Sequence, residues 1–278
     1  MLYLDLFSGI GGFHLAAKNA GWSFDHTYHS EIVDYANAVY ARHFPDAVQL
    51  GDIRGIDGRA LRARHPGQEW VLTGGFPCQG ISGAGCRRGL EDPRSGLWYE
   101  MRRIIEELQP TILVAENSPH LRTRGLTEVV RGLATIGYGV WWSPLSAGSV
   151  GAPHRRERLW VVASKDGIGS LADASLHVLG CERGVRRIAP SGRDLGDDPE
   201  PEQSIDRDGV WSDWTAELSR RTLEGRSWLR RVGDGLSRGV DSDWGDWQER
   251  GRCLGNAVVP HVAEVIFRLI EAAGLKPD

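Results

Sequence analysis

The chain has 278 residues, which is enough to bury a large core and to form one large domain with a smaller one. Its hydrophobic content of 41% and charged content of 25% are ordinary for a globular protein. No apolar run reaches membrane-spanning length, and the first residues lack the pattern of an export signal. Four cysteines without Cys-x-x-Cys spacing favour neither a zinc site nor a disulfide framework, so we expect a cytoplasmic protein without a metal.

The formal net charge of −4 does not exclude a nucleic-acid partner, because binding depends on where the basic groups lie. Arginine supplies nearly all of the positive charge, and its planar fork suits phosphates and guanine edges. A genome rich in G and C would produce the same excess of arginine.

Strand and helix patterns alternate over residues 1–164. The residue patterns predict strands at 2–6, 27–30, 69–73, 111–115, 137–142 and 158–163. Helical patterns cover residues 12–21, 34–43 and 97–108. Strands that alternate with helices predict an α/β fold with a doubly wound, mostly parallel, Rossmann-like sheet.

The character of the chain changes from residue 165 to residue 253, where glycine, arginine and aspartate dominate and periodicity fades. Residues 194–208 are acidic and contain two prolines, which predicts an exposed flexible loop. A last amphipathic helix begins at Pro260. We therefore expect residues 1–164 and 254–278 to form one domain, with residues 165–253 as a smaller inserted domain.

Cys78 follows the predicted strand 69–73 within the run Gly74-Gly75-Phe76-Pro77-Cys78-Gln79. The glycines and the proline end the strand, so Cys78 lies beyond its carboxyl end, where ligands bind in open α/β sheets. A thiol there can be a nucleophile if its surroundings favour the thiolate. A buried cysteine without a chemical role is the alternative.

A glycine-rich turn, Phe7-Ser8-Gly9-Ile10-Gly11-Gly12, joins the first strand to the first helix. Such turns bring backbone amides close to a nucleotide-like ligand, although a simple tight turn would look the same. Glu31 follows the second strand and suits a ribose diol. Asp52, in the run Gly51-Asp52-Ile53, is placed after a further short strand that precedes the strand 69–73, and it can accept a hydrogen bond from an adenine amine. Either acid alone is also a common helix cap.

Three further motifs carry polar groups. Glu116-Asn117 closes the strand at 111–115, where a partly desolvated carboxyl group can stay protonated and donate to a ring nitrogen. His154, Arg156 and Arg158 alternate at the entrance to the last strand and so share one side. Residues 254–260 form a short segment that leads directly into the final helix. A helix-capping pair and a solvated strand entrance are the alternatives for the first two motifs.

Together and in this order, the Pro-Cys-Gln, Glu-Asn and His-x-Arg-x-Arg elements resemble those of the cytosine-5 DNA methyltransferases of bacteria and phages. The resemblance covers residues 1–164 and 254–278. It implies that the protein binds S-adenosylmethionine and double-stranded DNA, and that it is an enzyme of the restriction–modification type. We expect a monomer that binds no membrane.

The resemblance also implies roles for individual residues. The implied catalytic residues are Cys78, Glu116, Arg156 and Arg158. The implied contacts to S-adenosylmethionine are Phe7, Ser8, Gly9, Ile10, Gly11, Gly12, Glu31, Ile32, Asp52, Ile53, Pro77, Leu97, Asn256 and Ala257.

These residues suit a difficult reaction, because carbon 5 of cytosine is a poor nucleophile inside an aromatic ring. Addition of the Cys78 thiolate to carbon 6 would make carbon 5 enamine-like. Glu116 would bond ring nitrogen 3 and the exocyclic amine, and Arg158 would hold the 2-oxo group. The base must leave the duplex first, because stacked bases are out of reach. Residues 80–97 are placed to close over it.

Three other readings compete with this one. A tRNA cytosine methyltransferase of the same fold typically carries a Cys-Phe-Thr signature, which the sequence lacks. A non-catalytic module that binds DNA or regulates a partner would usually have lost residues equivalent to Cys78, Glu116 and Arg158. A nicotinamide dehydrogenase is supported by the glycine turn alone.

Overall fold

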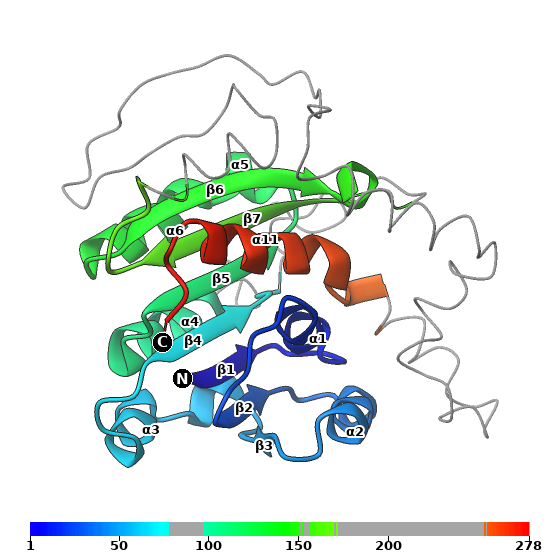
Figure 1. The fold of residues 1–278 in the computed structure, drawn as a ribbon, viewed down its shortest axis with the longest axis vertical. Coiled ribbons are helices and arrows are strands. Elements are labelled where there is room, and N and C mark those ends of the chain that lie inside the picture. Colours follow the sequence, from blue (N-terminus) through cyan, green and yellow to red (C-terminus); the bar gives the residue numbers. More distant parts are fainter. Residues whose placement is uncertain are drawn as a thin grey trace.

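The computed structural model describes residues 1–77, 97–150, 156–169 and 255–277, together with residues 152, 171 and 253. Seven strands form one sheet in the order β3-β2-β1-β4-β5-β7-β6 (Figure 1). The strands are β1 (Leu2–Leu6), β2 (His26–Ser30), β3 (Val48–Gln49), β4 (Trp70–Gly74), β5 (Ile112–Asn117), β6 (Gly139–Ser146) and β7 (Glu157–Ser164). Strands β1 to β5 pair in parallel, whereas β7 is antiparallel to both β5 and β6.

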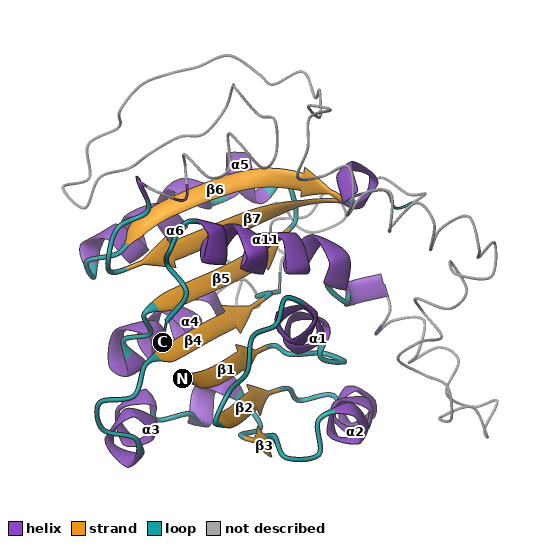
Figure 2. Cartoon of the chain, in the orientation of Figure 1, coloured by secondary structure: helices purple, strands orange, loops and turns teal. Residues whose placement is uncertain are grey.

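Helices cover both faces of the sheet (Figure 2). They are α1 (Gly12–Asn19), α2 (Asp34–His43), α3 (Gly58–Arg64), α4 (Leu97–Leu108), α5 (Leu121–Arg124), α6 (Leu126–Thr135) and α11 (Pro260–Ala272). The buried side chains of α3, α4 and α6 form one apolar cluster with the sheet, and those of α1 and α11 form a second. The mostly parallel, doubly wound sheet confirms the predicted fold class.

The central strands are buried on both faces, which is why their sequences read as apolar runs rather than as alternating patterns. Every residue of β1, β4 and β5 is buried. Helix α4 is one-sided, as its spacing predicts: Trp98, Met101, Ile104, Ile105 and Leu108 are all buried. Burial of this apolar stripe, rather than helix propensity, stabilises the helix.

Strand β5 begins one residue after its predicted start and ends two residues after its predicted end, because Glu116 and Asn117 pair with Trp160 and Leu159 of β7. Glu116 is therefore part of the sheet and not of the loop that follows it. Helix α1 is shorter than predicted: it ends at Asn19, and Gly21 then takes a left-handed conformation with φ +82°. Both differences arise from contacts or dihedrals that residue periodicity does not report.

The C-terminal helix α11 packs beside α1 on one face of the sheet, although more than 200 residues separate them in the sequence (Figure 1). Met1 and Leu275 contact the same apolar cluster, so both ends of the described chain lie near each other. The predicted inserted domain at 165–253 lies almost wholly outside the described residues, as does its loop at 194–208. The division into two domains stays a prediction.

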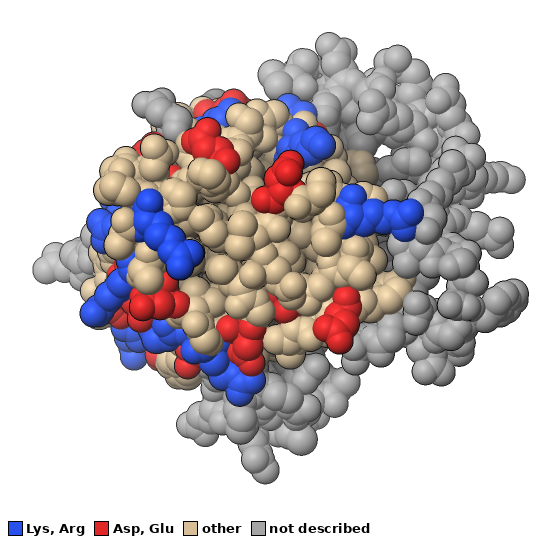
Figure 3. Space-filling view, turned by 90° about the horizontal axis from the view of Figure 1, so that it is seen from below, with Lys and Arg blue, Asp and Glu red and all other residues tan. Residues whose placement is uncertain are grey.

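Basic and acidic side chains lie intermixed on the face shown in Figure 3, and much of the surface between them is uncharged. Within the described ranges, no helix has the length and apolar character needed to cross a membrane.

A carboxyl group lies inside the sheet beneath the glycine turn. Asp5 of β1 is fully buried, and its Oδ1 accepts a 2.8 Å hydrogen bond from the Thr73 hydroxyl of β4. Thr73 also hydrogen bonds with the Tyr3 hydroxyl at 2.6 Å, whereas Asp5 Oδ2 has no partner. Burial raises the pKa of Asp5 to about 8, although the Thr73 hydrogen bond acts in the opposite direction. Asp5 is therefore mostly protonated at neutral pH.

Asp5→Asn should remove a pH dependence of stability. Between about pH 4 and about 8, native Asp5 holds a proton that the unfolded chain has released, so the free energy of unfolding falls as pH rises. Across this window we expect the free energy of unfolding of the wild type to fall by about 1.4 kcal/mol per pH unit relative to that of Asp5→Asn. Urea unfolding at several pH values measures the slopes. Asp46→Asn, the same change at an exposed position, should parallel the wild type. Equal slopes for Asp5→Asn and the wild type would contradict the assignment.

Candidate ligand pocket and its carboxylate

The carboxyl ends of β1, β2, β4 and β5 meet at one edge of the sheet, and a cavity of about 570 Å³ opens there. This is the edge at which parallel α/β sheets bind ligands. Its wall is assembled from segments far apart in the sequence: the glycine turn, the ends of β2 and β5, the turn after β3, the start of α4 and the segment before α11. The volume is in the range of pockets that hold small molecules.

The glycine turn follows β1 directly and reverses the chain into α1. Phe7, Gly9 and Gly11 all have positive φ values, of +53°, +52° and +88°. The Ser8 amide donates to the Ser30 carbonyl at 3.0 Å, and the Ser8 hydroxyl hydrogen bonds with His29 Nδ1 at 3.1 Å. Burial lowers the pKa of His29 to about 4, so its ring is neutral near pH 7. The turn is thus anchored to β2 through both backbone and side chain.

The Glu31 carboxylate connects the end of β2 to the glycine turn. Its Oε2 accepts the Gly9 amide at 2.9 Å, and its Oε1 accepts the amides of Ile32 and Val33 at 2.8 and 2.9 Å. Val33 is the residue before α2, so Glu31 acts in part as a helix cap. The same bonds fix the carboxylate at the wall of the cavity and leave about one acceptor site, on Oε2, for a ligand.

Asp52 is held by a neighbour that the sequence motif does not reveal. It caps the 3₁₀ turn Ile53–Gly55, and its Oδ2 lies 2.5 Å from Arg54 Nη2. Hydrogen bonds from Arg54 are the main reason that the pKa of Asp52 is lowered. Both residues line the cavity and are partly exposed. A ligand amine that approaches Asp52 would share it with the Arg54 guanidinium.

Glu116 is the most strongly perturbed acid in the cavity wall. It is 9% exposed, and Arg158 Nε lies 2.8 Å from its Oε1. Burial raises the pKa of Glu116 to about 7, because desolvation outweighs the opposing effects of Arg158 and Arg156. Near neutral pH the carboxyl group therefore exists in both protonation states, which suits an acid that donates to a ligand and recovers its proton.

Asn117 holds the chain that leads to Cys78. Its buried Nδ2 donates to the Phe76 carbonyl at 3.0 Å, and its Oδ1 accepts the Ser118 amide at 2.8 Å. Phe76 and Pro77 line the cavity beside Glu116. Cys78 itself lies outside the described residues, as does His154. The segment that precedes Cys78 is therefore fixed against the end of β5.

Arg156 points to a different part of the site from Arg158. Its Nη2 donates to the Ala257 carbonyl at 2.6 Å. This bond attaches the segment before α11 to the start of β7. Burial is the main reason that the pKa of Arg156 is lowered. The segment that it holds, residues 255–258, forms part of the cavity wall.

The structure brings most of the predicted site residues to this one cavity. Those that line it are Phe7, Ser8, Gly9, Ile10, Gly12, Glu31, Ile32, Asp52, Ile53, Pro77, Leu97, Glu116, Arg158, Asn256 and Ala257. Gly11 and Arg156 do not line it. The roles of all these residues stay predictions.

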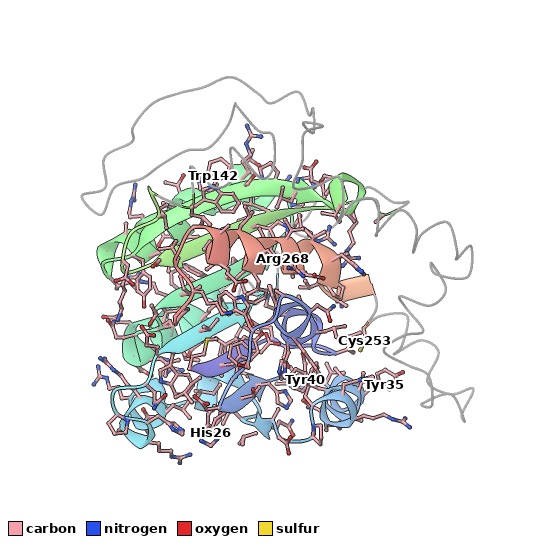
Figure 4. The ribbon with its side chains drawn as sticks, in the orientation of Figure 1. His26, Tyr35, Tyr40, Trp142, Cys253 and Arg268 are labelled. Atoms are coloured by element: carbon pink, nitrogen blue, oxygen red, sulfur yellow. The ribbon has the colours of Figure 1, made fainter. Side chains whose placement is uncertain are left out.

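Sequence reasoning missed twelve residues of the cavity wall, among them Arg54, Asn117, Ser30 and Cys253. Asn117 stands beside Glu116 in the motif and could have been found there. Arg54 follows Asp52 by two residues, a spacing that allows a capped turn. Cys253 contacts the apolar cluster of Ile10, Ala36 and Val39 between α1 and α2, and no motif marks it (Figure 4).

An open, mostly parallel α/β sheet with a glycine turn and acidic side chains at its ligand-binding edge defines the class of Rossmann-like folds. Residues 1–176 match the family model of the C-5 cytosine-specific DNA methylases, and the chain belongs to this family.

Individual relatives agree with this family. The chain is 38% identical over 177 residues to the type II methyltransferase M.AluI of Cellulosimicrobium cellulans, covering 58% of this chain and 33% of the relative. It is 36% identical over 169 residues to the type II methyltransferase M.NgoBI of Neisseria gonorrhoeae, covering 59% and 51%. The chain thus spans about a third to a half of the length of these relatives. The structure of the Entamoeba histolytica methyltransferase EhMeth has the same fold, with a TM-score of 0.64 and 16% sequence identity. The match covers 100% of this chain and 99% of that one.

The glycine turn gives a stability prediction that needs no ligand. An alanine at Gly11 would be strained at φ +88°, and its Cβ would lie 2.7 Å from the Phe44 ring. At Gly9 the φ is +52°, but the Cβ would meet nothing within 4 Å. We expect Gly9→Ala to cost about 1–2 kcal/mol of unfolding free energy from the backbone alone. Gly11→Ala should cost about 1–3 kcal/mol more from overpacking. Urea unfolding measures both, and equal losses would contradict the close approach of Phe44.

Proposed function

We propose that the protein transfers a methyl group from S-adenosylmethionine to carbon 5 of cytosine in double-stranded DNA. The observation that carries the proposal is the buried Glu116, whose pKa of about 7 and contact with Arg158 occur in the same cavity as the glycine turn. An acid that is protonated near neutral pH is what recognition of cytosine nitrogen 3 requires. Membership of the C-5 cytosine-specific DNA methylase family supports the same reaction.

The cavity suits S-adenosylmethionine, which supplies an electrophilic methyl group when it is bound. The glycine turn lines the cavity with Phe7, Ser8, Gly9, Ile10 and Gly12, and the cavity has the volume of a small-molecule pocket. Glu31 is oriented by three amides and can accept from a ribose diol. Ile32 is 69% exposed at the cavity wall and offers an apolar surface to an adenine ring. Asp52 is available to the adenine amine.

Glu116 and Arg158 would act on the target base rather than on the cofactor. Protonated Glu116 donates to ring nitrogen 3, and its other oxygen accepts from the exocyclic amine. Arg158 holds the 2-oxo group. These bonds draw electrons from the ring and so favour attack at carbon 6.

Cys78 would be the nucleophile. Its thiolate sulfur would form a bond to carbon 6, and the ring electrons would move to carbon 5. Carbon 5 would take the methyl group as the bond from that group to the sulfonium sulfur breaks, which leaves S-adenosylhomocysteine. Carbon 5 then loses its proton to a base, the carbon–sulfur bond breaks, and Cys78 leaves as thiolate. The attachment of Phe76 to Asn117 supports this role, because it holds the preceding residues beside Glu116.

Recognition of the DNA sequence would belong to residues 165–253. The target cytosine must turn out of the duplex to reach a buried carboxyl group, which supports base flipping. Every proposed catalytic group lies outside residues 165–253, so this segment is free to contact base edges and phosphates.

Cys78→Ser should abolish methylation in cells. DNA from cells that express the wild type should show methylated cytosines at a defined sequence by bisulfite sequencing, and DNA from cells with Cys78→Ser should show none. The serine variant should still bind S-adenosylhomocysteine, because Cys78 attacks the base and does not hold the cofactor. The purified wild type should form a covalent adduct with target duplex carrying 5-fluorocytosine, since fluorine does not leave as the proton does. Methylation by the variant, or no adduct, would refute the mechanism.

The methylation rate should depend on the protonation of Glu116. Because Glu116 must carry a proton to donate to nitrogen 3, the single-turnover rate should fall as pH rises above about 7. Glu116→Gln keeps a donor that does not titrate, so we expect it to be slower by about 100-fold or more and to lack this descending limb. Rates across pH 6–9 with saturating cofactor and DNA provide the test. If the rate of Glu116→Gln also falls above about pH 7, the group that titrates is not Glu116.

A further inference from the structure

Arg103 lies on α4, outside the cavity wall, and holds the turn that follows β3. Its Nη1 donates to the Ile56 carbonyl at 2.9 Å, and its Nη2 donates to the Ile53 carbonyl at 3.2 Å. Its Nε and Nη1 also contact Glu100 and Glu107, at 2.9 and 3.0 Å. One guanidinium group therefore joins two backbone carbonyls to two carboxylates of its own helix.

The segment held in this way has little regular structure of its own. Strand β3 has two residues, and the 3₁₀ turn Ile53–Gly55 has three. Asp52 and Ile53 nevertheless form one wall of the cavity. Glu107 extends the same attachment, because its Oε2 accepts the amide of Gly58 at the start of α3 at 2.9 Å. Arg103 and Glu107 thus fix both ends of the segment 53–58 to α4.

Helix α4 also reaches the cavity directly through its first residue, Leu97. Six residues separate Leu97 from Arg103, a rise of about 9 Å along a rigid helix. The parts of the cavity wall formed by Leu97 and by Asp52 and Ile53 are therefore both attached to helix α4. Apolar packing of Ile53 and Ile56 in the cluster with α4 would keep the segment folded without Arg103 but would not set its backbone orientation.

We propose that Arg103 is a positioning residue for S-adenosylmethionine: it sets the place of Asp52 and Ile53 through the Ile53 and Ile56 carbonyls and touches no ligand itself. This inference rests on the proposed function of the cavity. The planar fork matters, because the two nitrogens reach two carbonyls at once, whereas a lysine ammonium offers a single point of contact.

Four variants separate this role from general stability. Arg103→Met keeps an unbranched apolar stem and removes every donor, and Arg103→Lys keeps the charge but not the fork. Glu100→Gln weakens the ion pair at 2.9 Å and leaves both carbonyl bonds in place. Arg268→Met is the matched control on α11: Arg268 likewise pairs with a glutamate four residues away, Glu264, and donates to a backbone carbonyl, that of Asn19 (Figure 4).

Calorimetry with S-adenosylhomocysteine is the main measurement, with thermal unfolding without ligand in parallel. We expect Arg103→Met to raise the dissociation constant by at least about tenfold and Arg103→Lys to lie between it and the wild type. Glu100→Gln and Arg268→Met should stay within about twofold of the wild type. With unmethylated genomic DNA as substrate, Arg103→Met should raise the KM for S-adenosylmethionine and leave kcat unchanged.

The outcomes distinguish the inference from the proposed function. If the wild type does not bind S-adenosylhomocysteine, the proposed function fails. If it binds and Arg103→Met binds equally well, only the role of Arg103 is refuted. An equal loss in Arg268→Met would also refute it, because the effect would then be general. If Arg103→Met does not fold, Arg103→Lys decides: wild-type affinity in that variant overturns the proposal.

Discussion

Strand β1 is paired in parallel on both sides and buried on both faces, and this constraint sets the place of nearly everything else. Because β2 and β4 run in the same direction as β1, their carboxyl ends emerge together, and each is followed by a polar or glycine-rich segment. The register aligns Leu6 with Ser30 and with Gly74. The three segments that follow these strands therefore begin at the same height along the sheet: the glycine turn, the residue Glu31 and the residues that lead to Cys78. A parallel sheet brings residues from distant parts of the chain together in this way.

Electrostatics at this edge follow from burial more than from pairing. Glu116 has an arginine at 2.8 Å, yet desolvation raises its pKa to about 7. The pairing of β5 with β7 explains both facts, because it draws Glu116 into the sheet and brings Arg158 alongside. Asp5 shows the same physics without a cation: it is fully buried, and its pKa rises to about 8. Burial thus raises the pKa of two carboxyl groups of the same sheet, Glu116 and Asp5, into the neutral range.

Much of the cavity wall depends on side chains that do not themselves line the cavity. Arg156 holds the Ala257 carbonyl, and Arg103 holds the Ile53 and Ile56 carbonyls. Arginine suits this use because it offers five donors in a rigid plane and stays charged when partly buried. Asn117, which does line the cavity, makes the same kind of attachment when its amide donates to the Phe76 carbonyl. The irregular segments around the cavity are therefore held by side-chain donors, where regular strands would use backbone pairing.

The sequence by itself determined the fold class and the order of the motifs, because buried parallel strands are apolar runs and the polar groups follow them directly. It also determined which residues would meet at the cavity, such as Glu31, Asp52 and Glu116, since parallel strands end at one edge. Only the tertiary structure decided how these groups are held. The extension of β5 to Asn117, the pairing of Asp52 with Arg54 and the attachment of Arg103 to residues 53–56 all depend on contacts made across the fold or within a local turn. Periodicity records which residues are buried, but the partner of each polar group is set by three-dimensional proximity.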